Sequence, residues 1–172
     1  MKVLLDTNIC IYMIKNKPPE VRKRFEQFVP GDIGISAITV AELQYGVTKS
    51  AAKEKNALAL EGFLLPLEIM AFDQDSALVY GKIRTYLERQ GTPIGGMDML
   101  IAAQAIAQGL TLITHNLKEF QRIPDLRCDV GCTASFMMFR RWRQRKPPWR
   151  SGVSQTRTRV VSRPELMRSI RG

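Results

Sequence analysis

Histidine is nearly absent from this chain, because His115 is the only one among 172 residues. An acid–base mechanism that uses two histidines is therefore excluded, and so is a zinc site rich in histidine. The three cysteines are Cys10, Cys128 and Cys132, and no pair has the Cys-x-x-Cys spacing of zinc or redox sites. We interpret them as free thiols.

Long apolar runs are also missing. No run approaches the roughly 20 apolar residues that a membrane-spanning helix needs. The chain starts directly with an apolar strand-like segment, without the basic lead and long apolar core of a signal peptide. We therefore expect a cytoplasmic protein, and the length suits one compact domain with some excess.

Acidic residues are scarce only near the end of the chain. The formal net charge of the whole chain is +10. Residues 1–132 contain 15 basic and 15 acidic residues, whereas residues 133–172 contain 11 basic residues and one acid, Glu165. This change predicts a folded domain over residues 1–132 and a basic, disordered extension over residues 133–172. The extension is either an arm that binds nucleic acid, with Trp142 and Trp149 available to stack on bases, or a solvated segment without a selected role.

Short apolar runs alternate with amphipathic stretches along residues 1–132. Val3, Leu4 and Leu5 show no polar alternation, which predicts a strand buried on both faces. Further strands are predicted over residues 33–36, 67–72, 110–114 and 126–130. Helices are predicted over residues 9–14, 20–28, 39–47, 51–65, 73–90, 99–107 and 117–120. This order favours an α/β fold with a mostly parallel sheet and right-handed crossovers.

Three acidic residues are predicted at one edge of that sheet. Asp6 follows the first strand, Glu42 lies in the first turn of the helix after the second strand, and Asp98 begins the buried helix before the fourth strand. Ligands of open parallel sheets bind at the carboxyl ends of the strands. Clustered carboxylates repel one another unless a cation compensates, and Mg²⁺ or Mn²⁺ prefers oxygen ligands. This chemistry suits phosphodiester hydrolysis, in which a metal stabilises the phosphate and activates a water.

Each acid also has a purely structural interpretation. Asp6 closes an Asx turn near Asn8. Glu42 forms a capping box with Thr39, and Asp98 is a suitable N-cap for the helix that follows it. The coincidence of three such residues at one sheet edge favours the metal site.

Four segments resemble the ordered motifs of the PIN domain, and most closely those of the VapC-type toxins of bacterial toxin–antitoxin pairs. The segments are residues 4–8 (LLDTN), 38–46 (ITVAELQYG), 98–103 (DMLIAA) and 112–116 (LITHN). Residues 90–95 and 117–120 also resemble that subgroup, and the likeness runs from about Lys2 to about Arg127. Each motif is weak alone, but four in this order and spacing are specific.

The resemblance implies a PIN-like three-layer sandwich, with a central mostly parallel sheet flanked by helices. It implies a Mg²⁺-dependent endoribonuclease, with Mn²⁺ as an alternative ion, that hydrolyses RNA phosphodiester bonds and in some members cuts transfer RNA. It also implies a homodimer that a cognate antitoxin protein holds inactive by filling the active-site groove.

Matched to the family's motifs, Asp6, Glu42 and Asp98 fall on its acidic cluster. The resemblance implies that Asp6 and Asp98 hold the metal, directly or through water, and that Glu42 completes the pocket and orients the attacking water. The fourth acidic position of the family falls on Asn116, where an amide is a weaker ligand or positions a water. Glu119, one helical turn further on, either substitutes for that acid or is an exposed helix charge.

Several neighbouring residues are secondary candidates. Thr7 and Thr114 either hold metal-bound water and orient the acids, or make ordinary hydrogen bonds at strand ends. His115 either contacts RNA or has no role in the site. Four residues either line a groove for RNA bases or antitoxin, or pack in the core: Ile11, Tyr12, Leu43 and Tyr45.

Two other functions share some of these features with the nuclease. Aspartyl-phosphate hydrolases also place an acid after the first strand, but they need a second aspartate two residues on, where this chain has Asn8. A PIN module with a decayed catalytic site, which only binds RNA or antitoxin, would suit the amide at Asn116 and the basic extension. Metal-dependent cleavage of RNA separates this binding module from the nuclease.

Overall fold

Five short strands form one sheet in the computed structural model, which describes residues 2–16 and 31–130. The strand order is β3-β2-β1-β4-β5, and each neighbouring pair runs parallel. The strands are β1 (Val3–Leu5), β2 (Ile33–Ser36), β3 (Glu68–Met70), β4 (Thr111–Ile113) and β5 (Arg127–Asp129). The predicted parallel sheet is confirmed, with each predicted strand in its place.

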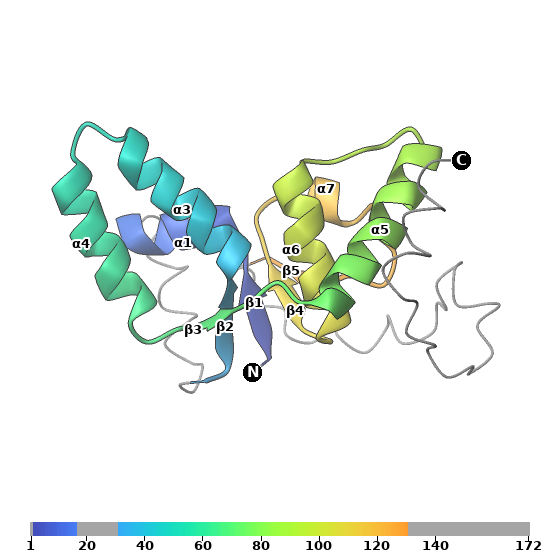
Figure 1. Ribbon diagram of the computed structural model, residues 1–172, viewed down its shortest axis with the longest axis horizontal. Helices are drawn as coiled ribbons and strands as arrows, with labels where there is room; N and C mark the ends of the chain where they lie inside the picture. Colours follow the sequence, from blue (N-terminus) through green and yellow to red (C-terminus); the bar gives the residue numbers. More distant parts are fainter. Residues whose placement is uncertain (1, 17–30, 131–172) are drawn as a thin grey trace, which may run out of the picture.

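Helices cover both faces of the sheet, which gives the predicted three-layer sandwich (Figure 1). One side carries α1 (Thr7–Lys15), α3 (Ala37–Lys49) and α4 (Lys53–Leu64), and the other carries α5 (Gln74–Arg89), α6 (Gly96–Ala107) and the short α7 (Leu117–Phe120). Successive side chains of a strand point to opposite faces. Leu4 therefore joins the core on the side of α5 and α6, whereas Val3 and Leu5 join the core on the other side.

The central strand β1 fixes where a functional site can form. It pairs with β2 on one side and with β4 on the other, and all three of its residues are buried. The chain builds β2 and β3 to one side of β1 and then crosses to build β4 and β5 on the other. Ligands of open α/β sheets bind at such a reversal of strand order, outside the carboxyl ends of the strands. Asp6 and Thr114 follow β1 and β4 at this point.

Some predictions lie outside the described residues, namely the helix over residues 20–28 and the basic extension over residues 133–172. The other predicted helices are present, with their ends shifted by a few residues. The prediction that Glu42 lies in the first turn of its helix is wrong. Helix α3 begins earlier, at Ala37, because Ser36 caps it, so Glu42 lies in the second turn. Within residues 2–16 and 31–130, no helix is both long and apolar enough to cross a membrane.

Candidate functional site

Asp6 lies at the carboxyl end of β1 and is buried, with only 2 % of its surface exposed. Its Oδ1 atom accepts a hydrogen bond from the backbone N–H of Ile9 at 2.8 Å, which caps the start of α1. Its Oδ2 atom accepts a hydrogen bond from the hydroxyl of Thr114 at 2.5 Å. Burial raises the pKa of Asp6, and the bond from Thr114 is the largest of the opposing contributions. Asp6 can therefore cap α1 and also take part in a functional site, because its two oxygens have different partners.

Thr114 connects Asp6 to the segment after β4. The Thr114 hydroxyl is fully buried and donates to Asp6, while its oxygen accepts the backbone N–H of Asn116 at 2.9 Å. The backbone carbonyl of Asn116 in turn accepts hydrogen bonds from Glu119 and Phe120 as α7 begins. The ends of β1 and β4 are thus tied together through one hydroxyl.

Glu42 comes from α3, on the other side of β1. The hydroxyl of Thr7, the first residue of α1, donates to Glu42 Oε2 at 2.5 Å. The capping box between Thr39 and Glu42 is absent, because the hydroxyl of Ser36 caps α3 by accepting from the N–H of Ile38. Glu42 is therefore held by α1 rather than by the start of its own helix.

Asp98 is the third residue of α6 and not its N-cap, because the helix begins at Gly96 behind Gly95. The pKa of Asp98 is raised to about 6, most of all by burial and then by the charges of Glu119, Glu42 and Asp6 in that order. These three charges belong to α7, α3 and the end of β1. We call Asp6, Glu42, Asp98 and Glu119 the acidic cluster.

Gly95 leaves room for the carboxylate of Asp98. A Cβ atom at position 95 would lie 3.0 Å from Asp98 Oδ2, a contact so tight that the carboxylate would have to move by a few tenths of an ångström. Neither Gly95 nor the cap Ser36 was predicted from the sequence. The local signals were a Gly-Gly pair just before the acid and a serine just before the apolar start of α3.

Without metal, replacing Asp98 by asparagine is expected to stabilise the protein at pH 8 but not at pH 4. The pKa of Asp98 is raised in the folded state, so the folded protein binds this proton more tightly than the unfolded chain. Its stabilising contribution is present below pH 4 and is lost as the pH rises through about 6. Because Asp98 is partly exposed to water, we expect a gain of only about 1 kcal/mol, or about 3 °C in Tm. Thermal melts in a chelator at both pH values measure the difference, and an equal gain at both would contradict this assignment.

The acidic cluster has the donor chemistry of a site for a hard divalent cation. In the described part of the chain, no three His, Cys, Asp or Glu side chains stand ready to ligate one metal ion. Mg²⁺ does not need such a cage, because it commonly takes one or two carboxylates and keeps several waters. The raised pKa of Asp98 comes first from burial and then from the charges of the other three acids, and a cation would relieve the repulsion among these charges. These residues therefore fit a hydrated divalent ion.

The remaining candidates divide between core and surface. Leu43 is buried and Ile11 packs against the same core, so these two are structural. Tyr12 and Tyr45 are exposed, by 38 % and 65 % of their surfaces. The ring of Tyr12 meets the ring of His115 edge-on, with centroids 4.9 Å apart and planes at 84°.

Comparison with known proteins assigns the family. The PIN domain model matches residues 3–126, which include every member of the acidic cluster. The tRNA(fMet)-specific endonuclease VapC of Salmonella typhimurium is 46 % identical over 132 residues, which are 77 % of this chain and 99 % of that protein. Ribonuclease VapC2 of Rickettsia felis is 48 % identical over 127 residues, or 73 % of this chain and 95 % of that protein.

A solved structure agrees with this relationship. The crystal structure of DNA-bound VapBC from Salmonella typhimurium contains a chain that matches with a TM-score of 0.73 at 45 % identity. The match covers 77 % of the present chain and 99 % of that one. The chain therefore belongs to the PIN-domain family, and within it to the VapC-type proteins.

Proposed function

We propose that this chain is a divalent-metal-dependent endoribonuclease and the toxin of a toxin–antitoxin pair. The observation that carries the proposal is the convergence of charge on Asp98, whose pKa is raised first by burial and then by the charges of Glu119, Glu42 and Asp6 together. A hydrated cation at such a cluster suits phosphodiester hydrolysis. RNA is the proposed substrate class, because relatives that are 46 % and 48 % identical are named as a tRNA-specific endonuclease and a ribonuclease.

Asp6 and Asp98 are the proposed metal ligands, and Mg²⁺ is the proposed ion, with Mn²⁺ as the alternative. When bound, the ion supplies positive charge to the scissile phosphate and lowers the pKa of a water. Asp6 is oriented in advance, because both of its oxygens accept hydrogen bonds. Glu42, steadied by the hydroxyl of Thr7, is the proposed group that orients the attacking water.

Glu119 is the proposed fourth acid, in place of the amide at Asn116. Among the charges that raise the pKa of Asp98, that of Glu119 acts most strongly. Asn116 has a different connection, because its backbone N–H donates to Thr114. We assign Asn116 to holding Thr114, and through it Asp6.

A cognate antitoxin is the proposed protein partner, because the similar solved structure is a VapBC complex. A homodimer is proposed from the family relationship. Transfer RNA is the proposed substrate, after the relative from Salmonella typhimurium. The acidic cluster repels an RNA phosphate, so productive binding at this point requires the cation.

The full-length chain is expected to cut transfer RNA only when Mg²⁺ or Mn²⁺ is present. Chelation with EDTA should reduce the rate of RNA cleavage to the rate seen in buffer without protein, because the acidic cluster then repels the scissile phosphate. End-labelled RNA resolved on a denaturing gel measures the rate. Recovery of cleavage when excess Mg²⁺ is returned controls for unfolding by the chelator.

A decayed binding module is the second candidate, and the amide at Asn116 is the observation that favours it. Such a protein would bind RNA without cutting it in either ion. If Asn116→Asp then restored cleavage, the missing acid would be the cause of the decay. Metal-dependent cleavage by the unchanged chain would instead dismiss this candidate.

A further inference from the structure

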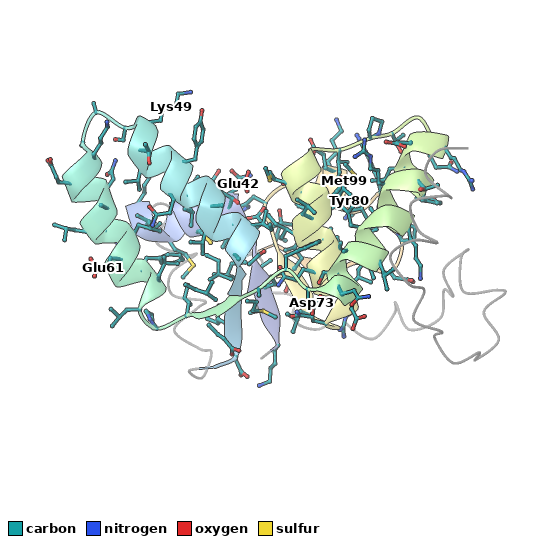
Figure 2. All side chains as sticks on the ribbon, viewed as in Figure 1. Glu42, Lys49, Glu61, Asp73, Tyr80 and Met99 are labelled. Carbon is teal, nitrogen blue, oxygen red and sulfur yellow. The ribbon has the colours of Figure 1, made fainter. Side chains whose placement is uncertain are left out.

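One face of α3 extends from the acidic cluster toward the surface. Glu42, Tyr45 and Lys49 follow one another at i, i+3 and i+7, so they share one side of this helix. Helix α3 buries Thr39 and Leu43, which lie on another side. Figure 2 shows Glu42 near the middle of α3 and Lys49 at its far end. The exposed residues Tyr45 and Lys49 therefore continue this side of α3 away from the acidic cluster.

The two side chains beyond Glu42 are an aromatic ring and a cation. Tyr45 exposes 65 % of its surface, and the Nζ atom of Lys49 lies 5.8 Å from the centroid of its ring. Seven residues of helix place the backbone of Lys49 about 10 Å along the axis from that of Glu42. Proteins that hold single-stranded nucleic acid combine such groups, with aromatic rings that stack on bases and cations that track phosphates.

We propose that Tyr45 and Lys49 form an RNA subsite next to the cleavage position. A base of single-stranded RNA stacks on the ring of Tyr45, and a neighbouring phosphate binds the ammonium of Lys49. This proposal rests on the proposed function, because it requires the scissile phosphate to lie at the acidic cluster beside Glu42. The order along α3 of acid, ring and cation then follows the order of phosphate, base and phosphate along the strand.

RNA explains these groups better than an apolar protein segment does. A covering peptide would remove the ammonium of Lys49 from water without supplying an opposite charge, which is unfavourable. A nucleotide supplies both a flat base for the ring and a phosphate for the cation. Lys49 also lies in the last turn of α3, where a cation stabilises a helix, but that role does not require an exposed ring beside the acidic cluster.

The Tyr45→Ala variant of the full-length chain is expected to raise KM for an RNA substrate about tenfold and to leave kcat nearly unchanged. Tyr45→Phe keeps the stacking face and should retain the original KM. The Lys49→Ala variant should make the log–log dependence of RNA affinity on salt shallower by about one unit. Lys82→Ala on α5 and Leu58→Ala on α4 remove equally exposed groups from other helices and serve as matched controls.

RNA affinity, measured separately from cleavage, distinguishes failure of the subsite from failure of the proposed function. A chain that binds RNA without cutting it loses the proposed function, yet Tyr45→Ala should still weaken its RNA affinity about tenfold. Equal KM and equal affinity for Tyr45→Ala and the unchanged chain would overturn the subsite. The subsite would also be overturned if Tyr45→Ala weakened only the binding of antitoxin. That result would assign this face of α3 to the protein partner. Alanine is a good helix former, so each variant should keep the original Tm.

Discussion

Replacing Asp6 by asparagine is expected to slow RNA cleavage about a thousandfold while leaving the Tm nearly unchanged. The lost charge removes several kcal/mol of metal-assisted stabilisation of the transition state, and each 1.4 kcal/mol is about tenfold in rate. Asparagine is as good an N-cap as aspartate, so its oxygen still accepts the N–H of Ile9, and its amide N–H can donate to the hydroxyl oxygen of Thr114 in place of the bond that the carboxylate accepts. Initial rates and thermal melts of the full-length chain measure the two effects.

Asp73 offers a matched control for this substitution. It caps α5 as Asp6 caps α1, since its Oδ1 atom accepts the N–H of Ser76 at 2.8 Å. Asp73 lies near Gln108 just beyond the end of α6, whereas Asp98 lies at the start of that helix. Asp73→Asn should therefore keep full activity. A rate for Asp6→Asn close to that of the unchanged chain would refute the role of Asp6 as a metal ligand.

Replacing Thr114 by valine is expected to reduce cleavage by about 10- to 100-fold, the usual effect of removing a group that orients a metal ligand. It should also lower the free energy of unfolding by about 2 kcal/mol at neutral pH, because the buried carboxylate of Asp6 loses a donor. The bond from Thr114 lowers the pKa of Asp6, so it stabilises the ionised form in the folded state. The loss of stability should therefore shrink as the pH falls and Asp6 becomes protonated.

Thr39 is the control for the loss of a buried hydroxyl. It is also fully buried, but its hydroxyl lies 3.5 Å from the carbonyl oxygen of Leu5, too far for a strong hydrogen bond. Thr39→Val should change stability and activity little, whereas Thr114→Ser should keep both because it retains the donor. Chemical denaturation at pH 5 and pH 8, together with initial rates, provides the comparison. Equal effects of the two valine substitutions would contradict the positioning role of Thr114.

The strands could be predicted because a strand that is buried on both faces consists of consecutive apolar residues, which are easy to recognise in a sequence. Val3, Leu4 and Leu5 form a continuous apolar run, and all three are buried in the centre of the sheet. Helix starts were less predictable where several residues can cap. Ser36 and Thr39 both have a hydroxyl, and the packing of Thr39 beneath β1 leaves the cap to Ser36.

The sequence predicted the convergence of the acids but not how they are held. The edge of a parallel sheet brings Asp6, Glu42 and Asp98 together by topology alone. The partners of these acids depend on register, because the pairing of Leu5 with Ile113 is what places Thr114 beside Asp6. Asp98 was a plausible cap because Gly95 and Gly96 have no side chain to compete with it. Local patterns contain no information on the register of β1 and β4, whereas the Gly-Gly pair before Asp98 was a local signal for the start of α6.

The long sequence separation between β1 and its partner β4 has a consequence for synthesis on the ribosome. The hydrogen bond between Thr114 and Asp6 joins positions 108 residues apart, and the two central strands pair across a similar interval. A nascent or truncated chain that stops before β4 lacks both Thr114 and Glu119. It leaves β1 without one neighbour and Asp6 without its donor. The candidate site therefore assembles only after β4 and α7 have been synthesised, because a growing chain that has not reached them lacks the complete acidic cluster.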